Sequence, residues 1–175
     1  DETNNLLKAK KIYTYITTKF RYRYVRSYAS IENVPEYMAV NRRGDCGIYA
    51  MLFINLCRVC GIPAHWESGI VAKPNHIGSH DWALFYVDGL GWRHADLSFG
   101  GGAKLRGDER RWQFYFGNVD QYRIPFNQDC CTSFEPPMNF FRSDPTDNQS
   151  GETEFETRIS KHGEVERIVS AIEIT

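Results

Sequence analysis

One cysteine of this chain, Cys46, stands at the start of a predicted helix, where residues 43–47 read RGDCG. A cysteine attacks a carbonyl only as the thiolate, and the free N–H groups at a helix N-terminus favour that anion. Asp45 is a suitable N-cap, and the neighbouring glycines leave the sulfur little cover. The apolar segment that follows predicts a buried helix, which ends near Gly61 and Pro63. Cys46 is therefore a candidate nucleophile.

A cysteine nucleophile needs a base to take its proton and an acceptor that fixes the tautomer of the base. Residues 80–86 and 90–96 predict two strands of a hairpin around the Asp88-Gly89 turn. With a three-residue loop centred on Asp88, His80 lies directly opposite Asp96, within reach of a hydrogen bond. A two-residue loop would instead turn Asp96 to the other face of the hairpin.

His94 is the main competitor of His80 for the role of base. In the three-residue register it lies on the same face as His80 and opposite Trp82, as a core or supporting histidine. The other histidines have no equally placed carboxylate and are expected to face solvent or bond locally: His65, His76 and His162.

The order of these segments resembles that of the transglutaminase-like superfamily. RRGDCG at 42–47 and the helix end RVCGIPA at 58–64 are similar to the nucleophile segment of that family. HDW at 80–82 and the run from VDG at 87–89 to AD at 95–96 are similar to its His-x-Trp and Trp-x-x-x-Asp segments. The resemblance covers residues 12–99. It implies a papain-like core and acyl transfer through a thioester, with Cys46 as nucleophile, His80 as base and then acid, and Asp96 as orienter.

The oxyanion of such a reaction needs two donors. The backbone N–H of Cys46 is a natural first donor. The animal enzymes of the family use an upstream tryptophan as the second, but the first tryptophan here is Trp66. Tyr24, Tyr28 and Asn33 remain as alternatives. Calcium activation is not expected, because no loop alternates acidic ligands.

The elements that must position these residues begin with helices and continue with strands. The expected elements are an amphipathic helix over 6–20, a short helix from the Asn33 cap to Asn41, strands at 64–71 and 115–124, and a hairpin of 154–159 with 164–174 across 161–163. This order predicts an α+β fold in which N-terminal helices, with the nucleophile at a helix N-terminus, pack on an antiparallel β-sheet. Loops at 73–79 and 100–107, the latter starting with a flexible triple glycine, are expected to border the cleft.

The domain organisation follows from the strongest loop signal, at 144–151. Residues 1–143 are predicted to form the catalytic domain. Residues 144–175 either complete the same sheet or begin a further domain.

Composition limits the partners. The chain has 175 residues, 42% of them hydrophobic, and a net charge of −1, which gives no reason to expect nucleic acid or an anionic membrane as partner. The alternating Arg and Tyr residues at 21–28 predict a strand with one solvent-exposed and one packed face.

No apolar run approaches the ~20 residues of a membrane span. A chain that begins at Asp1 would already lack a signal peptide, and an extracytoplasmic or secreted location is expected.

The five cysteines do not predict a disulfide framework. Cys46 and Cys57 are too far apart on one helix to be bridged. The C-x-x-C of Cys57 and Cys60 falls in the last helical turn, where no terminus lowers a thiol pKa, so a redox or zinc role is disfavoured. Together with Cys130 and Cys131, these residues are expected to be small apolar core residues. No metal and no cofactor are expected.

The function predicted is that of a cysteine hydrolase or transamidase whose substrate is a protein, a peptide or another amide. Hydrolysis is favoured, because cross-linking needs a water-poor channel for the acceptor amine. The alternative is a non-catalytic binding or assembly module that keeps the fold. The sequence leaves the oligomeric state open.

Overall fold

The computed structural model describes residues 2–74, 76–142, 146, 151–161, 163–166 and 168–170. In chain order its elements are α1 (Asn5–Lys19), β1 (Arg21–Tyr22), the 3₁₀ turn η1 (Tyr28–Ser30), α2 (Val34–Asn41), β2 (Arg43–Gly44), α3 (Cys46–Val59), β3 (Ala64–Lys73), β4 (His76–Val87), β5 (Gly91–Ala95), α4 (Leu97–Leu105), α5 (Glu109–Phe114), β6 (Phe116–Gly117), β7 (Arg123–Asn127), β8 (Glu154–Phe155) and β9 (Arg158–Ile159).

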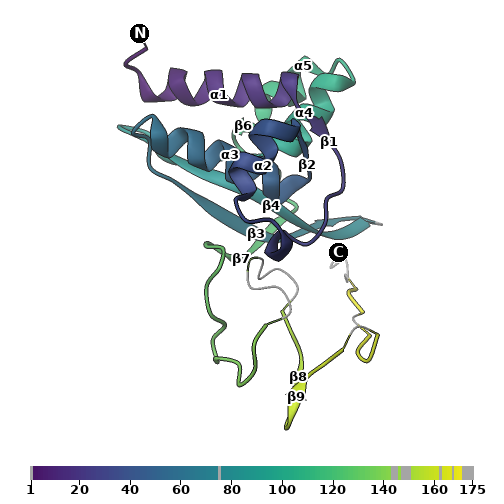
Figure 1. Cartoon of the computed structure of the whole chain (residues 1–175). Coiled ribbons are helices and arrows are strands. Elements are labelled where there is room, and N and C mark those ends of the chain that lie inside the picture. Colours follow the sequence, from purple (N-terminus) through teal and green to yellow (C-terminus); the bar gives the residue numbers. More distant parts are fainter. Residues whose placement is uncertain are drawn as a thin grey trace.

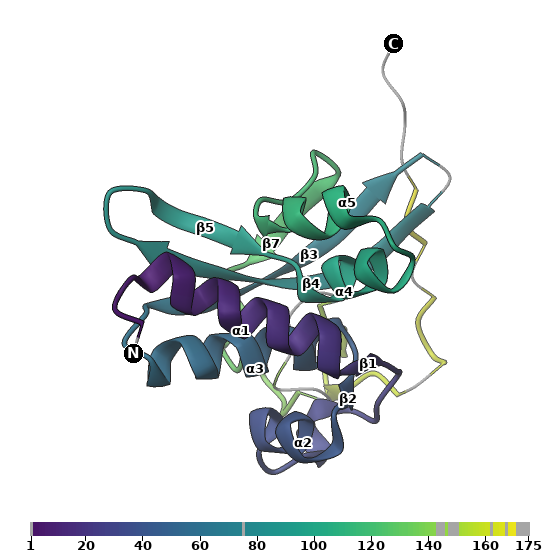
Figure 2. The same cartoon turned by 90° about the horizontal axis from the view of Figure 1, so that it is seen from above.

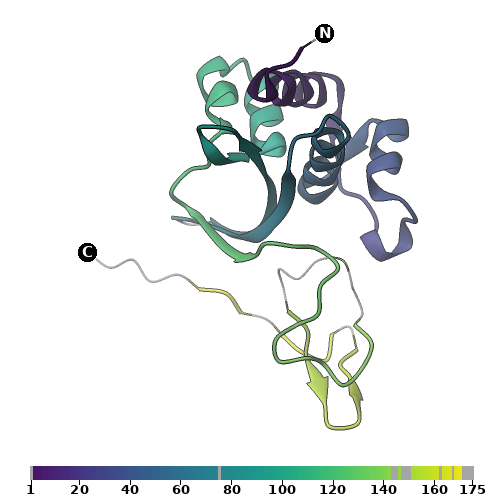
Figure 3. The same ribbon diagram turned by 90° about the vertical axis from the view of Figure 1, so that its left-hand side faces the viewer.

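A five-stranded antiparallel sheet forms the centre of the molecule, with the strand order β6-β5-β4-β3-β7. Helices α1 and α3 form a layer over this sheet (Figure 1), and α4 and α5 lie beside α1 (Figure 2). Figure 3 shows that the sheet is strongly curved. The predicted α+β fold with N-terminal helices on an antiparallel sheet is confirmed.

Helix α3 is built as its sequence predicts. The Asp45 side chain caps it by accepting a hydrogen bond from the Ile48 N–H at 3.4 Å. Gly61 follows its end in the left-handed region, with φ at 79°. The buried face of α3 packs on β4, where the rings of Phe53 and Phe85 meet edge to face at 5.7 Å. These contacts hold α3 against the sheet, with its first residue, Cys46, next to the central strand β4.

Residues 100–102 are helical, so the predicted flexible glycine loop is wrong. Asp96 starts α4 by accepting a hydrogen bond from the Phe99 N–H at 2.9 Å. The helix then passes so close to α1 that a Cβ atom on Gly100 would overlap the hydroxyl of Tyr13. Glycine is required here for close helix packing, rather than for mobility. The predicted loop at 73–79 is also wrong, because β3 runs through Lys73 and β4 begins at His76.

Two neighbouring glycines of α4, Gly100 and Gly101, allow a matched test of this packing. Replacing Gly100 with alanine is expected to lower the free energy of unfolding by about 1–3 kcal/mol, because the new methyl group displaces the Tyr13 ring. Gly101→Ala meets only ordinary contacts with Thr17 and is expected to stabilise the helix by about 0.5–1 kcal/mol. Urea unfolding of both variants measures the difference. Equal effects would show that α1 and α4 are not in close contact.

The hairpin of β4 and β5 has its turn one residue later than predicted. Val87 pairs with Gly91, so the loop is centred on Gly89, which has φ at 76°. In this register His94 faces Leu84 rather than Trp82, and His80 does not directly oppose Asp96. The pairing differs from the predicted one by two residues. Because side chains alternate faces with a period of two, His80, His94 and Asp96 still belong to one face.

Three other predicted elements differ from the structure. The segment 21–28 pairs only through β1, whose two residues are both exposed, so it is not a half-buried strand. The predicted strand at 115–124 is divided between β6 and β7. The predicted hairpin of 154–159 with 164–174 is replaced by β8 and β9, which pair with each other inside the first of these segments. Residues 164–166 and 168–170 are not strands, and residues 162, 167 and 171–175 lie outside the described part.

The β8–β9 hairpin does not pair with the five-stranded sheet and projects away from the helices (Figure 3). Glu154 of β8 accepts hydrogen bonds from the backbone N–H groups of Asn139 at 3.0 Å and Phe140 at 3.3 Å. Most of the predicted loop at 144–151 lies outside the described residues. Among the described helices, none is both long and apolar enough to cross a membrane.

Candidate active site

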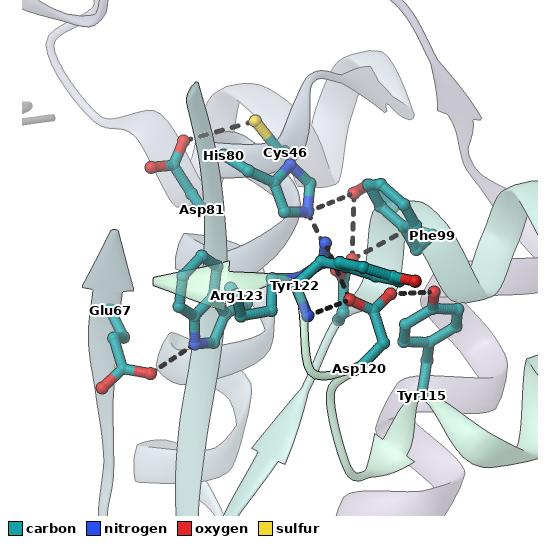
Figure 4. A network of polar contacts seen from close by, with 12 residues as sticks. Cys46, Glu67, His80, Asp81, Phe99, Tyr115, Asp120, Tyr122 and Arg123 are labelled. Atoms are coloured by element: carbon teal, nitrogen blue, oxygen red, sulfur yellow. Dashed lines mark hydrogen bonds and ion pairs between the residues drawn. The ribbon is translucent and has the colours of Figure 1, made fainter. Parts of the chain in front are cut away.

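Cys46 is the first residue of α3, as predicted, and is half-buried. Its Sγ atom donates a hydrogen bond to Oδ2 of Asp81 at 3.3 Å (Figure 4). Asp81 directly follows His80 on β4. The structure therefore places the sulfur against the chain neighbour of the predicted base and gives it a carboxylate partner that the sequence analysis did not single out.

The surroundings of Cys46 act against the thiolate. Burial is the largest effect that raises the pKa of this thiol, and the negative charges of Asp81 and Asp45 raise it further. A backbone hydrogen bond from Asp81 lowers the pKa but does not offset these effects. In this arrangement burial and the two carboxylates raise the pKa of Cys46 above its ordinary value, whatever the helix terminus contributes.

His80 and Asp96 are brought together as predicted. Nε2 of His80 donates a hydrogen bond to Oδ2 of Asp96 at 2.8 Å, and the two residues are only 5% and 0% exposed. Asp96 lies between β5 and α4, where its other oxygen, Oδ1, accepts the N-cap hydrogen bond from Phe99. The Phe99 ring also packs edge to face on the imidazole, with 4.7 Å between ring centroids. One carboxylate therefore caps a helix and fixes a histidine.

Arg123 on β7 is a further partner of Asp96, and the sequence analysis missed it. Its Nη2 atom donates to the same oxygen, Oδ2, at 2.7 Å, and its side chain is only 2% exposed. The guanidinium lies over the Phe99 ring at 4.2 Å, and Nη1 approaches Asp120 at 3.7 Å. Figure 4 shows Arg123 and Asp120 next to this network. Because Arg123 and Asp96 are 27 residues apart, no local spacing signals the pair.

The charge of Asp96 results from these partners. Burial by itself would raise the pKa of the carboxyl, but the charges of His80 and Arg123 and the hydrogen bonds from His80 and Phe99 lower it to about 2. Asp96 is therefore ionised at neutral pH. With Nε2 of His80 engaged by this carboxylate, Nδ1 is the ring nitrogen that remains for another partner.

Trp82 is fixed beside His80 by a buried carboxylate. Its indole N–H donates a hydrogen bond to Oε2 of Glu67, and its ring stacks on the imidazole with centroids 6.1 Å apart. Nε2 of His94 lies 3.3 Å from the same Glu67 oxygen. Burial would raise the pKa of Glu67, but the contacts with His94 and Trp82 lower it. His94 is therefore a supporting histidine, which agrees with one of its two predicted roles.

The three residues predicted as alternatives for the second oxyanion donor differ in exposure and in their hydrogen-bond partners. Tyr24 is 90% exposed, and the side chain of Asn33 caps α2. The Tyr28 hydroxyl donates a hydrogen bond to Asp45 and is therefore engaged. The sequence analysis did not consider a fourth residue, Tyr22. Its side chain is 55% exposed, and its partial burial, the charges of Cys46 and Asp45 and a hydrogen bond with Cys46 raise its pKa.

The remaining cysteines and histidines take no part in this network. All five cysteines are free thiols. Cys57 is buried, as expected, but Cys60 and Cys131 are exposed, so the prediction that they are core residues is wrong. Within the described part of the chain, no group of three or more His, Cys, Asp or Glu residues is arranged to hold a metal ion. Nδ1 of His65 lies 3.0 Å from the carbonyl of its chain neighbour Trp66, as a local bond, and 3.0 Å from the distant Gln128 carbonyl. His76 is exposed, and His162 lies outside the described residues.

The sequence of this chain was compared with models of known protein families. The model of the transglutaminase-like superfamily matches residues 1–97, more than half of the chain. The chain belongs to the transglutaminase-like superfamily. Membership of this superfamily supports a general cysteine-protease-like or transamidase role. No curated protein matches the chain.

Two solved structures are similar to this superfamily member. The periplasmic domain of TgpA from Pseudomonas aeruginosa has a TM-score of 0.50 at 18% identity, over 64% of this chain and 42% of that one. A protein from Cytophaga hutchinsonii described as a putative cysteine protease has a TM-score of 0.45 at 26% identity, over 51% of this chain and 30% of that one. The chain thus spans less than half the length of either, and the likeness to TgpA concerns the fold alone.

Asp81 gives a direct test of the state of Cys46. Asp81→Asn removes one of the two charges that raise the pKa of Cys46, so alkylation of Cys46 by iodoacetamide at pH 7 is expected to become about tenfold faster. The rate is measured by mass spectrometry of the Cys46 peptide, with the exposed Cys60 of the same molecule as the internal control. An unchanged ratio of the two rates would show that Asp81 does not hold the thiol.

Proposed function

We propose that this chain catalyses acyl transfer from an amide or peptide through a thioester on Cys46, with His80 as base and then acid and Asp96 as orienter. The observation that carries the proposal is the buried hydrogen bond of 2.8 Å between His80 and Asp96. His80 directly precedes Asp81, the residue to which the Cys46 sulfur is hydrogen-bonded. Residues 1–143 are proposed as the catalytic unit, since β8 and β9 pair outside its sheet.

The reaction begins with a movement of the thiol. In the arrangement described, the Cys46 proton is directed at Asp81, so Sγ must turn towards Nδ1 of His80 before that proton can be transferred. The thiolate then attacks the amide carbonyl, and the imidazolium gives its proton to the leaving amine. Water next attacks the thioester, with His80 as base, and regenerates the thiol. Hydrolysis is favoured over amine transfer because Cys46 is not fully buried, so water can reach it.

Tyr22 is the proposed second oxyanion donor. The backbone N–H of Cys46 is the first. The hydroxyl of Tyr28 is engaged by Asp45, whereas the interaction of Tyr22 is with Cys46 itself. A phenol hydroxyl beside the sulfur could donate to the carbonyl oxygen that the sulfur attacks.

One observation favours the alternative, a non-catalytic module that keeps the fold. A nucleophile held as the thiol by Asp81 is inert in this arrangement. The two functions differ in whether Cys46 can be acylated.

The decisive experiment is therefore acylation of Cys46. The protein is incubated with p-nitrophenyl acetate, and acetyl-cysteine is located by mass spectrometry before and after hydroxylamine, which cleaves thioesters. The proposal expects a hydroxylamine-sensitive acetyl group on Cys46 that is absent from Cys46→Ala and strongly reduced in His80→Gln. The exposed Cys60 is the internal reference. Equal labelling of Cys46 and Cys60, independent of His80, would favour the binding module.

A further inference from the structure

We propose that a basic cavity between the C-terminal end of α1 and helix α2 binds an acidic segment of the substrate polypeptide. The cavity has a volume of about 770 Å³. Six of its ten lining residues are cationic: Lys19, Arg21, Arg23, Arg26, Arg42 and Arg43. The inference rests on the proposed function and adds a substrate class to it.

The positive charge of this cavity is not compensated. None of its lining residues is acidic, although the chain as a whole has a net charge of −1. All six cationic residues are exposed. In the described part of the molecule, none of their side chains forms an ion pair or a hydrogen bond with another residue. Six cations gathered around one cavity repel one another, and an anionic ligand relieves that repulsion.

The cavity is separated from the nucleophile by a single short strand. Strands β1 and β2 run parallel, with Arg21 beside Arg43, and Arg43 is three residues before Cys46. Arg21 and Arg23, on either side of Tyr22 in the chain, both line the cavity, whereas Tyr22 does not. Tyr22 between them packs against Tyr49, with ring centroids 6.2 Å apart, and interacts with Cys46. The cavity residue Arg43 is therefore joined to Cys46 through only two residues, Gly44 and Asp45.

An acidic peptide is the ligand that fits this arrangement best. Guanidinium groups bind carboxylates through two parallel hydrogen bonds, and five of the six cations are arginines. The volume falls within the range of about 300–1,000 Å³ of ordinary ligand pockets, enough for several residues. An extended polypeptide can occupy the cavity and present its own amide to Cys46. We therefore assign the anionic segment to the same chain that carries the reactive amide.

The test measures binding without catalysis, in the Cys46→Ala background. The probe is a fluorescein-labelled peptide with six glutamates, compared by fluorescence anisotropy with a peptide of the same length that has glutamine at those positions. The glutamate peptide is expected to bind at least tenfold more tightly, with an affinity that falls as salt is added. Arg23→Gln/Arg26→Gln is expected to weaken its binding about tenfold. The control Arg106→Gln/Arg110→Gln removes two exposed arginines outside the cavity and is expected to leave binding unchanged.

Three results would overturn the proposal. They are equal binding of the two peptides, equal weakening by the two double variants, and displacement of the glutamate peptide by an oligonucleotide at equal or lower charge concentration. Since Cys46→Ala cannot turn over substrate, these outcomes are independent of the acylation of Cys46 in the unmodified protein. The binding site and the catalytic proposal can therefore fail separately.

Discussion

Replacing His80 with glutamine is expected to lower kcat/KM for amide cleavage by about 10³-fold or more. Loss of a general base costs about 10²–10⁴-fold, and His80 is proposed to act as base in one step and as acid in another. Glutamine can still donate a hydrogen bond to Asp96, so the fold is expected to persist. Steady-state kinetics give the loss in rate, and thermal unfolding confirms that the variant is folded.

His94→Gln is the matched control for this variant. Both histidines belong to the same face of the hairpin, and each contacts a buried carboxylate, Asp96 for His80 and Glu67 for His94. His94 is separated from the reacting atoms by Trp82, so a change of less than about tenfold in kcat/KM is expected. Equal losses in the two variants would indicate a general effect on the sheet and would contradict the role of His80.

The second large effect is expected on stability. Arg123→Met should lower the free energy of unfolding by about 3–5 kcal/mol, because it breaks a buried ion pair and leaves Asp96 without its permanent positive partner. His80 is then the only basic side chain on the carboxylate, which keeps hydrogen bonds from the Ser98 hydroxyl and the Phe99 N–H. Urea unfolding at pH 7 measures the change, and Arg106→Met is the exposed control, expected to change the stability by less than about 0.5 kcal/mol. Equal stability of the two variants would contradict the pairing of Arg123 with Asp96.

The Asp96 carboxylate also determines how the free energy of unfolding depends on pH. The pKa of Asp96 is lowered in the folded state, from 3.8 to about 2, so its contribution is present above the unfolded value and is lost as the pH falls towards 2. That contribution amounts to about 2 kcal/mol. In Arg123→Met the folded pKa rises, and the remaining contribution is lost at a higher pH. Unfolding curves between pH 2 and 5 would show this shift.

The parts of the site that could be predicted from the sequence depend on local signals. Asp45 and Gly61 mark the two ends of α3 within one stretch of chain. The position of Cys46 at the start of this helix could therefore be predicted from the sequence. The pairing of His80 with Asp96 survived a wrong register because the error was an even number of residues, which leaves side chains on the same face.

Contacts between distant segments could not be predicted in this way. Arg123 reaches Asp96 only because β7 pairs with β3 across the sheet. The need for glycine at position 100 comes from the close approach of Tyr13 on α1, more than 80 residues earlier in the chain. Asp81 was visible beside His80, but alternation along a strand directs the two side chains to opposite faces, and the contact of Asp81 with Cys46 depends on the packing of α3 on β4.

The position of Arg123 has a consequence for biosynthesis. A nascent chain that has emerged only as far as β5 already contains Cys46, His80 and Asp96, but it lacks the arginine that neutralises the buried carboxylate. The polar centre of the sheet is therefore completed only after β7 has left the ribosome and paired with β3. On the proposed function, the order of translation delays the assembly of a reactive thiol until almost the whole catalytic unit has been made.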